Sequence, residues 1–485
     1  MIHAVPCGFL GSWMRKTGYS FQYESCLTGR KIRRVKSFRP RREVKLPKSR
    51  EGLVLTRLLL TSVIATALFA SKPTTVAQQV AATVKHLPGP SGKYAIGRIA
   101  YHWVDHSRIE QFSKVPGAKR ELMVYVWYPA DQSRDSKRSR YLPGIDVIAD
   151  GENGEDMRDF WGDSWALLRA DKVENQTLDA PPVASGSEPF PLLTFSPGLG
   201  IPVTAYTTLI QEVVSHGYVV VAIEPTYEAP VVIFPDGREV PALPEATGRH
   251  LPAPPGETRD QFIKRMHTFD EPHINRWAAD VRFSIDQITL LNGGKTSTAP
   301  FAGRLDLQDI AAWGHSFGGR GAARACQLDQ RIKACLNADG LGPDGPIFVF
   351  EGESLPSQPF MWMEVHHEPP TNAQLAPYGI TRKEWDKNHQ LQVATDEQQL
   401  RACPGGSFHV LLNSGGISHA SFTDEPFIAA TTEPPSKQAS VALGLIGGYT
   451  VAFFDRELKH RTGTVLDNKT PDKAGVTVQV APPSR

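Results

Sequence analysis

The chain has 485 residues, of which 40% are hydrophobic and 21% are charged, and this composition excludes a chain that is disordered throughout. Lys and Arg outnumber Asp and Glu by only 53 to 51, but residues 1–57 hold 14 basic and 3 acidic side chains, so the remainder is acidic. An acidic body offers no basic patch for phosphate groups, and we therefore expect no nucleic-acid partner.

An uncharged apolar stretch, residues 58–70, follows the basic leader. It is shorter than the roughly 20 residues that a membrane-spanning helix needs, and the small residues at 75–77 suit a cleavage site. We expect residues 1–77 to be a leader with a signal-like segment, and the protein to be exported to the periplasm or secreted. Because more than fifty residues precede the apolar stretch, an uncleaved membrane anchor and a short buried helix remain as alternatives.

Residues 78–485 are expected to form a single domain. Strand-like and helix-like segments alternate along it, which predicts the α/β class with a mostly parallel central sheet flanked by helices. The predicted strands are 121–128, 191–195, 218–223, 310–313, 335–338, 360–363 and 407–413, and the predicted helices are 157–168, 204–215, 276–291, 320–326 and 441–454. Residues 224–273 are rich in proline and are expected to be a lid-like insertion.

The sequence Gly-His-Ser-Phe-Gly at 314–318 lies between a predicted strand and a predicted helix. A serine at such a turn takes a strained backbone conformation that exposes its hydroxyl, and flanking glycines relieve the crowding. The motif predicts Ser316 as the nucleophile of a hydrolase. His315 occupies the variable position of the turn and is expected to be structural.

A serine hydroxyl needs a base to take its proton and an acid to orient that base. In this arrangement the acid follows the nucleophile in the chain, and Asp339 ends the next predicted strand, where the active-site groups of open α/β sheets gather. Asp339 is thus the predicted acid. Asp344, Glu364 and Glu368 are weaker alternatives.

The base should come after the acid, and six histidines do: His366, His367, His389, His409, His419 and His460. His419 lies in a glycine loop just past the last predicted core strand, which favours it as the base. His409 falls inside that strand, and the pair at 366–367 lacks metal-ligand spacing.

The oxyanion of the reaction needs two backbone N–H donors. One comes from the residue after the nucleophile, Phe317, and the other from a loop after an earlier strand. Residues 195–200, Phe-Ser-Pro-Gly-Leu-Gly, form such a loop, and Leu199 is the predicted donor.

Of the cysteines, Cys326, Cys335 and Cys403 lie in the predicted domain. An odd number leaves at least one free thiol, and export would permit one disulfide whose pairing the sequence does not choose. None has metal-ligand spacing. We expect no metal and no cofactor.

Taken together, these segments resemble the platelet-activating factor acetylhydrolase family, the plasma-type branch and its bacterial relatives, within the α/β-hydrolase superfamily of serine esterases. The resemblance rests on LP at 87–88, GKYAIG at 92–97, HWVD at 102–105, REL at 120–122, VWYP at 126–129, FSPGLG at 195–200, SHGY at 215–218, GHSFGG at 314–319, AD at 338–339 and SH at 418–419. It implies an α/β-hydrolase fold, a calcium-independent hydrolase of short or oxidised acyl esters of phospholipids, contact with lipid surfaces, and triad positions at Ser316, Asp339 and His419.

Two features depart from the family. Pro197 stands where animal members carry histidine, and residues 224–273 are longer and richer in proline than the family leads us to expect. A general short-chain esterase, a dienelactone-hydrolase-like enzyme or a polyester hydrolase with the same triad therefore remains an alternative. A catalytically silent binding protein with this fold is another, because a fold alone does not establish activity.

Overall fold

The computed structural model describes most of the chain from residue 84 onward. The described residues are 84–132, 135–148, 154–186, 188–248, 258–294, 300–342, 345–349, 353–376, 380–429, 437–467 and 475–483. The leader, its apolar stretch and Asp344 lie outside these residues. No helix in the described ranges combines the length and apolar character needed to cross a membrane.

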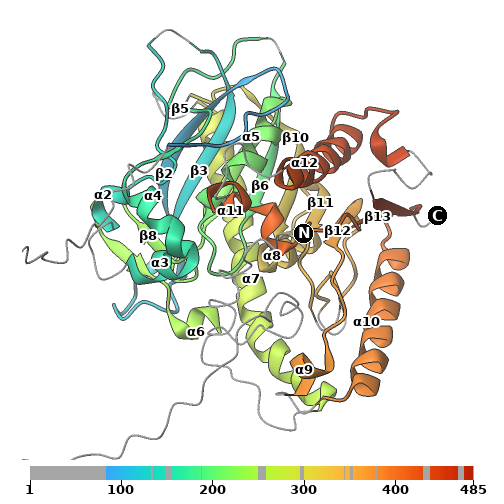
Figure 1. Ribbon diagram of the computed structural model, residues 1–485. Coiled ribbons are helices and arrows are strands. Elements are labelled where there is room, and N and C mark those ends of the chain that lie inside the picture. The colour runs from blue at the N-terminus through green and yellow to red at the C-terminus, as the bar shows by residue number, and fades with distance from the viewer. Residues whose placement is uncertain are drawn as a thin grey trace, which may run out of the picture. The chain divides into compact units, whose positions relative to one another are not determined.

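A ten-stranded sheet forms the centre of the molecule (Figure 1). Its strand order is β14-β13-β12-β11-β10-β6-β7-β3-β2-β5. Neighbouring strands from β13 to β7 run parallel. Strand β14 is antiparallel to β13, and β3 is antiparallel to both of its neighbours, β7 and β2. The strands are β2 (Ala95–Ile109), β3 (Lys119–Ala130), β5 (Thr177–Asp179), β6 (Phe190–Ser196), β7 (Val219–Glu224), β10 (Leu305–His315), β11 (Ile332–Ala338), β12 (Phe360–Val365), β13 (Ser407–Leu412) and β14 (Val476–Ala481).

Short strand pairs and helices complete the fold. Two small sheets pair β1 (Lys85–His86) with β4 (Val173–Glu174) and β8 (Val231–Ile233) with β9 (Glu239–Pro241). The helices are α2 (Ile145–Ile148), α3 (Glu155–Trp161), α4 (Trp165–Arg169), α5 (Thr207–Ser215), α6 (Pro244–Thr247), α7 (Arg259–Asn292), α8 (Phe317–Leu328), α9 (Asn372–Leu375), α10 (Arg382–Ala402), α11 (Glu425–Ile428) and α12 (Lys437–Glu457), with 3-10 turns η2 (Gly162–Ser164), η3 (Val203–Tyr206), η5 (His419–Phe422) and η6 (Val465–Asp467).

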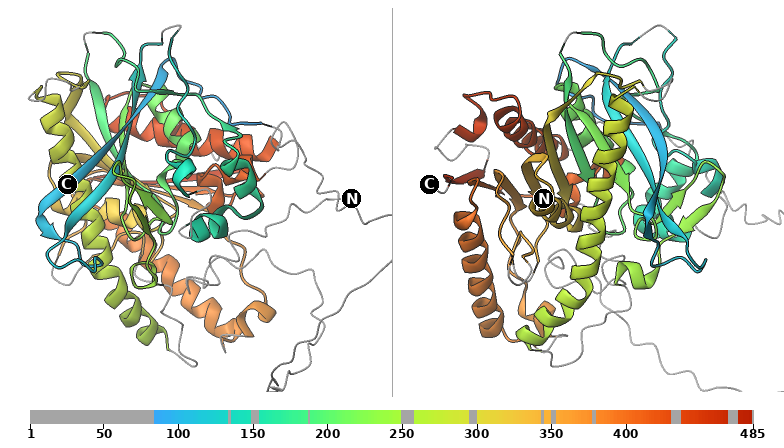
Figure 2. Two further views of the ribbon diagram at one scale, coloured as in Figure 1. Left: turned by 90° about the vertical axis from the view of Figure 1, so that its left-hand side faces the viewer. Right: turned by 180° about the vertical axis from the view of Figure 1, so that it is seen from behind.

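The two faces of the sheet bury separate hydrophobic cores. Successive residues of a strand point to opposite faces, and β7 is buried on both. Val220 and Ala222 pack into the core that contains α5 and α12, whereas Val219 and Val221 pack into the core that contains α7 and α8. Helices α5 and α12 lie in front of the sheet in Figure 1, and α7 comes to the front in the view from behind in Figure 2.

Most of the predicted elements are confirmed, including the mostly parallel sheet flanked by helices. The predicted start of a helix at residue 276 is wrong, because α7 begins at Arg259 within the proline-rich segment. A capping box of Thr258 and Gln261 starts this helix. Pro272 removes one backbone donor inside it, but the buried side chains of Phe269 and Ile274 on either side anchor the helix. The long strand β2, the helix α10 and the edge strand β14 were not among the predicted elements.

One disulfide links α8 to β11. Cys326 and Cys335 form this bond, and both are fully buried. Cys403 is a buried free thiol whose pKa burial raises to about 12. The odd cysteine count thus leaves Cys403 as the free thiol of the described part of the chain.

Candidate active site

Ser316 occupies the tight turn between β10 and α8. Its backbone has φ 55° and ψ −126°, a conformation that a residue with a side chain rarely adopts. Two hydrogen bonds hold it there: the Ser316 N–H donates to the Ala338 carbonyl at 2.8 Å, and the Ser316 carbonyl accepts from the Gly319 N–H at 3.0 Å. The strained turn predicted from the motif is present, at the carboxyl end of a central strand.

The glycines around Ser316 are required by close backbone packing. A Cβ atom on Gly318 would lie 2.2 Å from the carbonyl oxygens of Ser196 and Pro197, and one on Gly314 would lie 2.4 Å from the backbone of Gly318. Both distances are far below van der Waals contact. The start of α8 therefore packs directly against the loop after β6, and a side chain would push them apart.

Asp339 and His419 are brought together although 80 residues separate them. Asp339 follows β11 with φ 53°, and its Oδ2 lies 2.6 Å from His419 Nδ1. The other oxygen, Oδ1, accepts the Val365 N–H at 3.0 Å. Both side chains are buried. The carboxylate therefore holds Nδ1 of His419 and leaves Nε2 as the nitrogen that can serve a reacting group.

His315 packs beside this pair. Its ring centroid lies 4.2 Å from that of His419 and 4.9 Å from that of Phe422, and its Nδ1 lies 2.8 Å from the Tyr206 hydroxyl. Burial lowers the pKa of His315 well below its ordinary value, so the ring is neutral. This packing agrees with a structural role.

The alternative acids and bases lie in other surroundings. Glu364 Oε2 lies 2.9 Å from His409 Nε2, and the His409 ring stacks on Trp362. Glu368 is exposed beside the exposed His366. His389 stacks on Trp385, and His460 lies beyond α12. None of these groups is paired with Asp339 or His419 in the contacts described above.

His367 was one of the six histidines that the chain order allowed as the base, and it also faces the acid. Its Nε2 lies 3.6 Å from Asp339 Oδ1. Burial alone would lower the pKa of His367, but the interaction with Asp339 outweighs it and raises the pKa. For Asp339 the effect of burial has the opposite sign, because burial alone would raise the pKa of a carboxyl group. Hydrogen bonds from His367 and His419 instead hold the pKa of Asp339 well below its usual range. Asp339 is therefore ionised at neutral pH.

The loop after β6, which contains Leu199, packs against the start of α8 next to Ser316, because the Ser196 and Pro197 carbonyls face Gly318. Its hydrogen bonds use other amides: Gly198 N–H donates to the Tyr206 hydroxyl at 2.9 Å, Gly200 N–H to the Glu228 carbonyl at 3.0 Å, and Ile201 N–H to the Gly198 carbonyl at 3.0 Å. The Leu199 amide takes part in none of these bonds. The first amides of a helix also lack acceptors within the helix, which leaves the Phe317 N–H available.

The side chains of both predicted oxyanion donors belong to one small apolar cluster. Its buried members are Leu199, Phe269, Ile274, Trp277, Phe317 and Phe348. The Trp277 ring meets Phe317 edge-on with centroids 5.2 Å apart. Helix α7 supplies three of these six side chains, Phe269, Ile274 and Trp277, and of these Phe269 lies in the segment expected to be an insertion.

The described residues contain one group of side chains with metal-ligand proximity, and it coincides with this site. Ligand atoms of His315, Asp339 and His419 lie within 4.8 Å of one another. Nδ1 of His315 already lies at the Tyr206 hydroxyl, and Nδ1 of His419 already meets Asp339. The arrangement suits proton transfer to and from a serine hydroxyl.

Comparison with known proteins gives the same assignment as the sequence motifs. Residues 80–232 match the family model described as platelet-activating factor acetylhydrolase, isoform II. Over these residues the chain is similar to the platelet-activating factor acetylhydrolases. The matched stretch contains the loop at 195–200 and ends before Ser316.

Two curated relatives support this relationship. The chain is 26% identical over 290 residues to a probable 1-alkyl-2-acetylglycerophosphocholine esterase from Arthroderma benhamiae, covering 58% of the chain and 66% of the relative. It is 27% identical over 172 residues to a platelet-activating factor acetylhydrolase from Cavia porcellus, covering 33% of the chain and 36% of the relative. The alignments thus span about two thirds and about one third of the relatives' lengths.

A solved structure shares the fold. A ferulic acid esterase from Streptomyces cinnamoneus matches with a TM-score of 0.56 and 23% sequence identity, over 82% of the chain and all of that structure. The predicted α/β-hydrolase fold is confirmed.

Proposed function

We propose that this protein is a serine carboxylic ester hydrolase related in activity to the platelet-activating factor acetylhydrolases. One observation carries the proposal: the strained Ser316 lies at the end of β10, beside the 2.6 Å contact between Asp339 and His419. The family match and the names of the two curated relatives agree with it.

The reaction proceeds through an acyl-enzyme on Ser316. Oγ attacks the ester carbonyl while His419 Nε2 takes the hydroxyl proton, and ionised Asp339 stabilises the imidazolium through Nδ1. The backbone N–H groups of Leu199 and Phe317 donate to the oxyanion of the tetrahedral intermediate. His419 then returns the proton to the leaving alcohol. Water attacks the acyl group in the same manner, which releases the acid and restores Ser316.

The proposed substrates are short acyl esters of the acetyl phospholipid type. The relatives' names and the family resemblance support this class. Contact with lipid surfaces and export from the cell through the leader belong to the same proposal. N-terminal sequencing of the protein recovered outside the cytoplasm tests the export, because a start after Ala77 is expected and a start at Met1 would contradict cleavage.

The first experiment is labelling with a serine-reactive fluorophosphonate. Wild type should be labelled and Ser316→Ala should not, because Oγ is the attacking atom. Ser284→Ala is the matched control, since Ser284 is fully buried in α7 and should not affect labelling. An unlabelled wild type would favour a silent binding protein instead.

The second experiment defines the ester. Turnover of an acetyl phospholipid is compared with that of water-soluble aryl acetate and butyrate. A kcat/KM at least tenfold higher for the acetyl phospholipid is expected. A preference for the soluble esters would support the general short-chain esterase.

A further inference from the structure

Two hydrogen bonds flank the Leu199 amide and restrain it from both sides. The Gly198 N–H before it donates to the Tyr206 hydroxyl at 2.9 Å, and the Gly200 N–H after it donates to the Glu228 carbonyl at 3.0 Å. Peptide units are planar, so fixing the units on either side leaves the Leu199 unit little rotational freedom. Within this unit the Gly198 carbonyl also accepts the Ile201 N–H at 3.0 Å, so one local bond and two anchors from other parts of the chain together set the direction of the Leu199 N–H.

Tyr206 forms the first anchor and ties the loop to the nucleophile turn. Its hydroxyl oxygen accepts the Gly198 N–H and lies 2.8 Å from His315 Nδ1. Burial raises the pKa of Tyr206 and lowers that of His315. The hydroxyl of Tyr206 therefore stays protonated and donates a hydrogen bond to Nδ1 of the neutral His315 imidazole. The chain of bonds therefore runs from the Gly198 amide to the residue that precedes Ser316.

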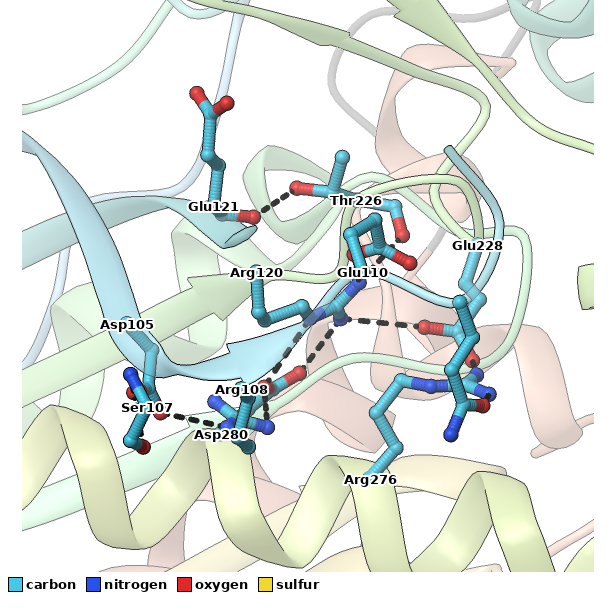
Figure 3. Close-up of polar contacts among 11 residues, drawn as sticks. Asp105, Ser107, Arg108, Glu110, Arg120, Glu121, Thr226, Glu228, Arg276 and Asp280 are labelled. Atoms are coloured by element: carbon cyan, nitrogen blue, oxygen red, sulfur yellow. Dashed lines mark hydrogen bonds and ion pairs between the residues drawn. The ribbon is translucent and has the colours of Figure 1, made fainter. Parts of the chain in front are cut away.

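The second anchor rests on a buried cluster of charges around Arg120 (Figure 3). The guanidinium of Arg120 donates to both oxygens of Asp280 at 2.6 and 3.2 Å and to Glu110 at 2.9 Å. It also donates to the Thr226 carbonyl at 2.9 Å and to the Glu228 carboxylate at 3.4 Å.

Arg276 holds the same glutamate from α7. It donates to the other oxygen of Glu228 at 2.9 Å, and Arg108 pairs with Asp280 at 2.7 Å. Arg120, Glu228 and Asp280 are almost completely buried. A buried charge is costly unless it is paired, so these bonds define one arrangement of the turn that carries Glu228.

The turn at 225–228 is therefore fixed at two points by one side chain. The Arg120 guanidinium donates to the Thr226 carbonyl and to the Glu228 carboxylate of this turn. The Glu228 carbonyl in turn accepts the Gly200 N–H. The position of this carbonyl depends on the charge cluster. The network extends from β3 and α7 to the loop beside Ser316.

We propose that Tyr206 and Arg120 are positioning residues that aim the Leu199 amide at the oxyanion. Neither side chain touches the reacting atoms; each acts through an anchor of the loop. The inference rests on the proposed ester hydrolysis. It predicts a loss of transition-state binding with little change in substrate binding, because a misdirected donor is missed only when the oxyanion forms.

Tyr206→Phe tests the first anchor by removing one oxygen atom. Measured on an aryl acetate, kcat should fall about tenfold with KM within about twofold, the size of effect expected for one weakened oxyanion donor. Affinity for a trifluoromethyl ketone, which forms a tetrahedral adduct with serine, should fall by about the same factor as kcat.

Tyr128→Phe is the matched control. Tyr128 is equally buried and donates to a backbone carbonyl, that of Pro181 at 2.6 Å, away from the loop. The Tyr128→Phe variant should be less thermally stable than wild type, but its kcat should not fall selectively relative to KM. Equal effects of the two substitutions would overturn the role of Tyr206.

Arg120→Lys tests the second anchor, with Arg98→Lys as a control for shortening a buried arginine. Arg120→Lys should lower kcat and ketone affinity together, whereas Arg98→Lys should leave both within about twofold of wild type. If Arg120→Lys does not fold, Glu228→Gln replaces it, because that change weakens the ion pairs and keeps the backbone carbonyl; about a fivefold loss of kcat is expected.

The outcomes separate the inference from the proposed function. Wild type without esterase activity would refute the ester hydrolysis itself. An active wild type with unchanged kcat and ketone affinity in Tyr206→Phe and in the folded Arg120→Lys or Glu228→Gln variant would refute only the positioning roles.

Discussion

Replacing Asp339 by asparagine should cost about four orders of magnitude in kcat, and the surroundings of the carboxylate give the reason. Oδ1 accepts the Val365 N–H at 3.0 Å, and Oδ2 meets His419 Nδ1 at 2.6 Å. The asparagine amide has only one oxygen. That oxygen should take the place of Oδ1, because an NH2 group there would face the Val365 N–H, which is also a donor. The NH2 group must then face His419 and donate to Nδ1. This selects the tautomer with hydrogen on Nε2, which cannot accept the Ser316 proton.

The assay is steady-state hydrolysis of an aryl acetate, with folding checked by circular dichroism and urea denaturation. Glu364→Gln is the control, because Glu364 pairs with His409 instead and should stay within about threefold of wild type. An Asp339→Asn enzyme within about tenfold of wild type would refute the tautomer argument and direct the search for the acid to Asp344.

Three further changes test the base, the disulfide and a buried carboxyl. His419→Ala should lower kcat at least a thousandfold while His409→Ala stays near wild type, because only His419 meets the acid. Replacing Cys326 and Cys335 by alanine should lower the free energy of unfolding by about 3 kcal/mol, since the bond closes a loop of sequence separation 9; urea denaturation measures this. Burial raises the pKa of Glu224 to about 8 from an ordinary 4.5, so the folded state holds a proton that the unfolded state releases. Its contribution to stability is present below about pH 4 and is lost as the pH rises towards 8, and Glu224→Gln should flatten that loss in urea midpoints at pH 5, 6.5 and 8.

Each of these changes has an outcome that would contradict it. An inactive His409→Ala enzyme beside an active His419→Ala enzyme would exchange the two roles. Cys403→Ala is the control for the disulfide, and a loss of stability as large as that of the double substitution would show that cavities rather than the cross-link account for the effect. An unchanged pH dependence in Glu224→Gln would mean that the glutamate does not bind the extra proton in the folded state.

Local chemistry made Ser316 and the core strands predictable. A tight turn between strand and helix needs glycines at fixed offsets, and a strand buried on both faces is a continuous apolar run, so both are visible in short stretches of sequence. The start of α7 was not predictable, because a proline-rich segment has little helical periodicity. Its helix depends on tertiary packing of side chains such as Phe269 and Trp277 into a cluster with residues from other elements.

The class of fold, the nucleophile turn, and the loop and chain order that point to Asp339 and His419 could all be inferred from the sequence. Which groups meet is visible only in three dimensions: Asp339 meets His419 and His367, Tyr206 meets the loop of Leu199, and Cys326 meets Cys335. This difference follows from the range over which the interactions act along the chain. Turn and strand preferences act over a few residues, whereas Asp339 and His419 are 80 positions apart in the chain and Tyr206 and His315 are 109 apart, and no local pattern records such pairings.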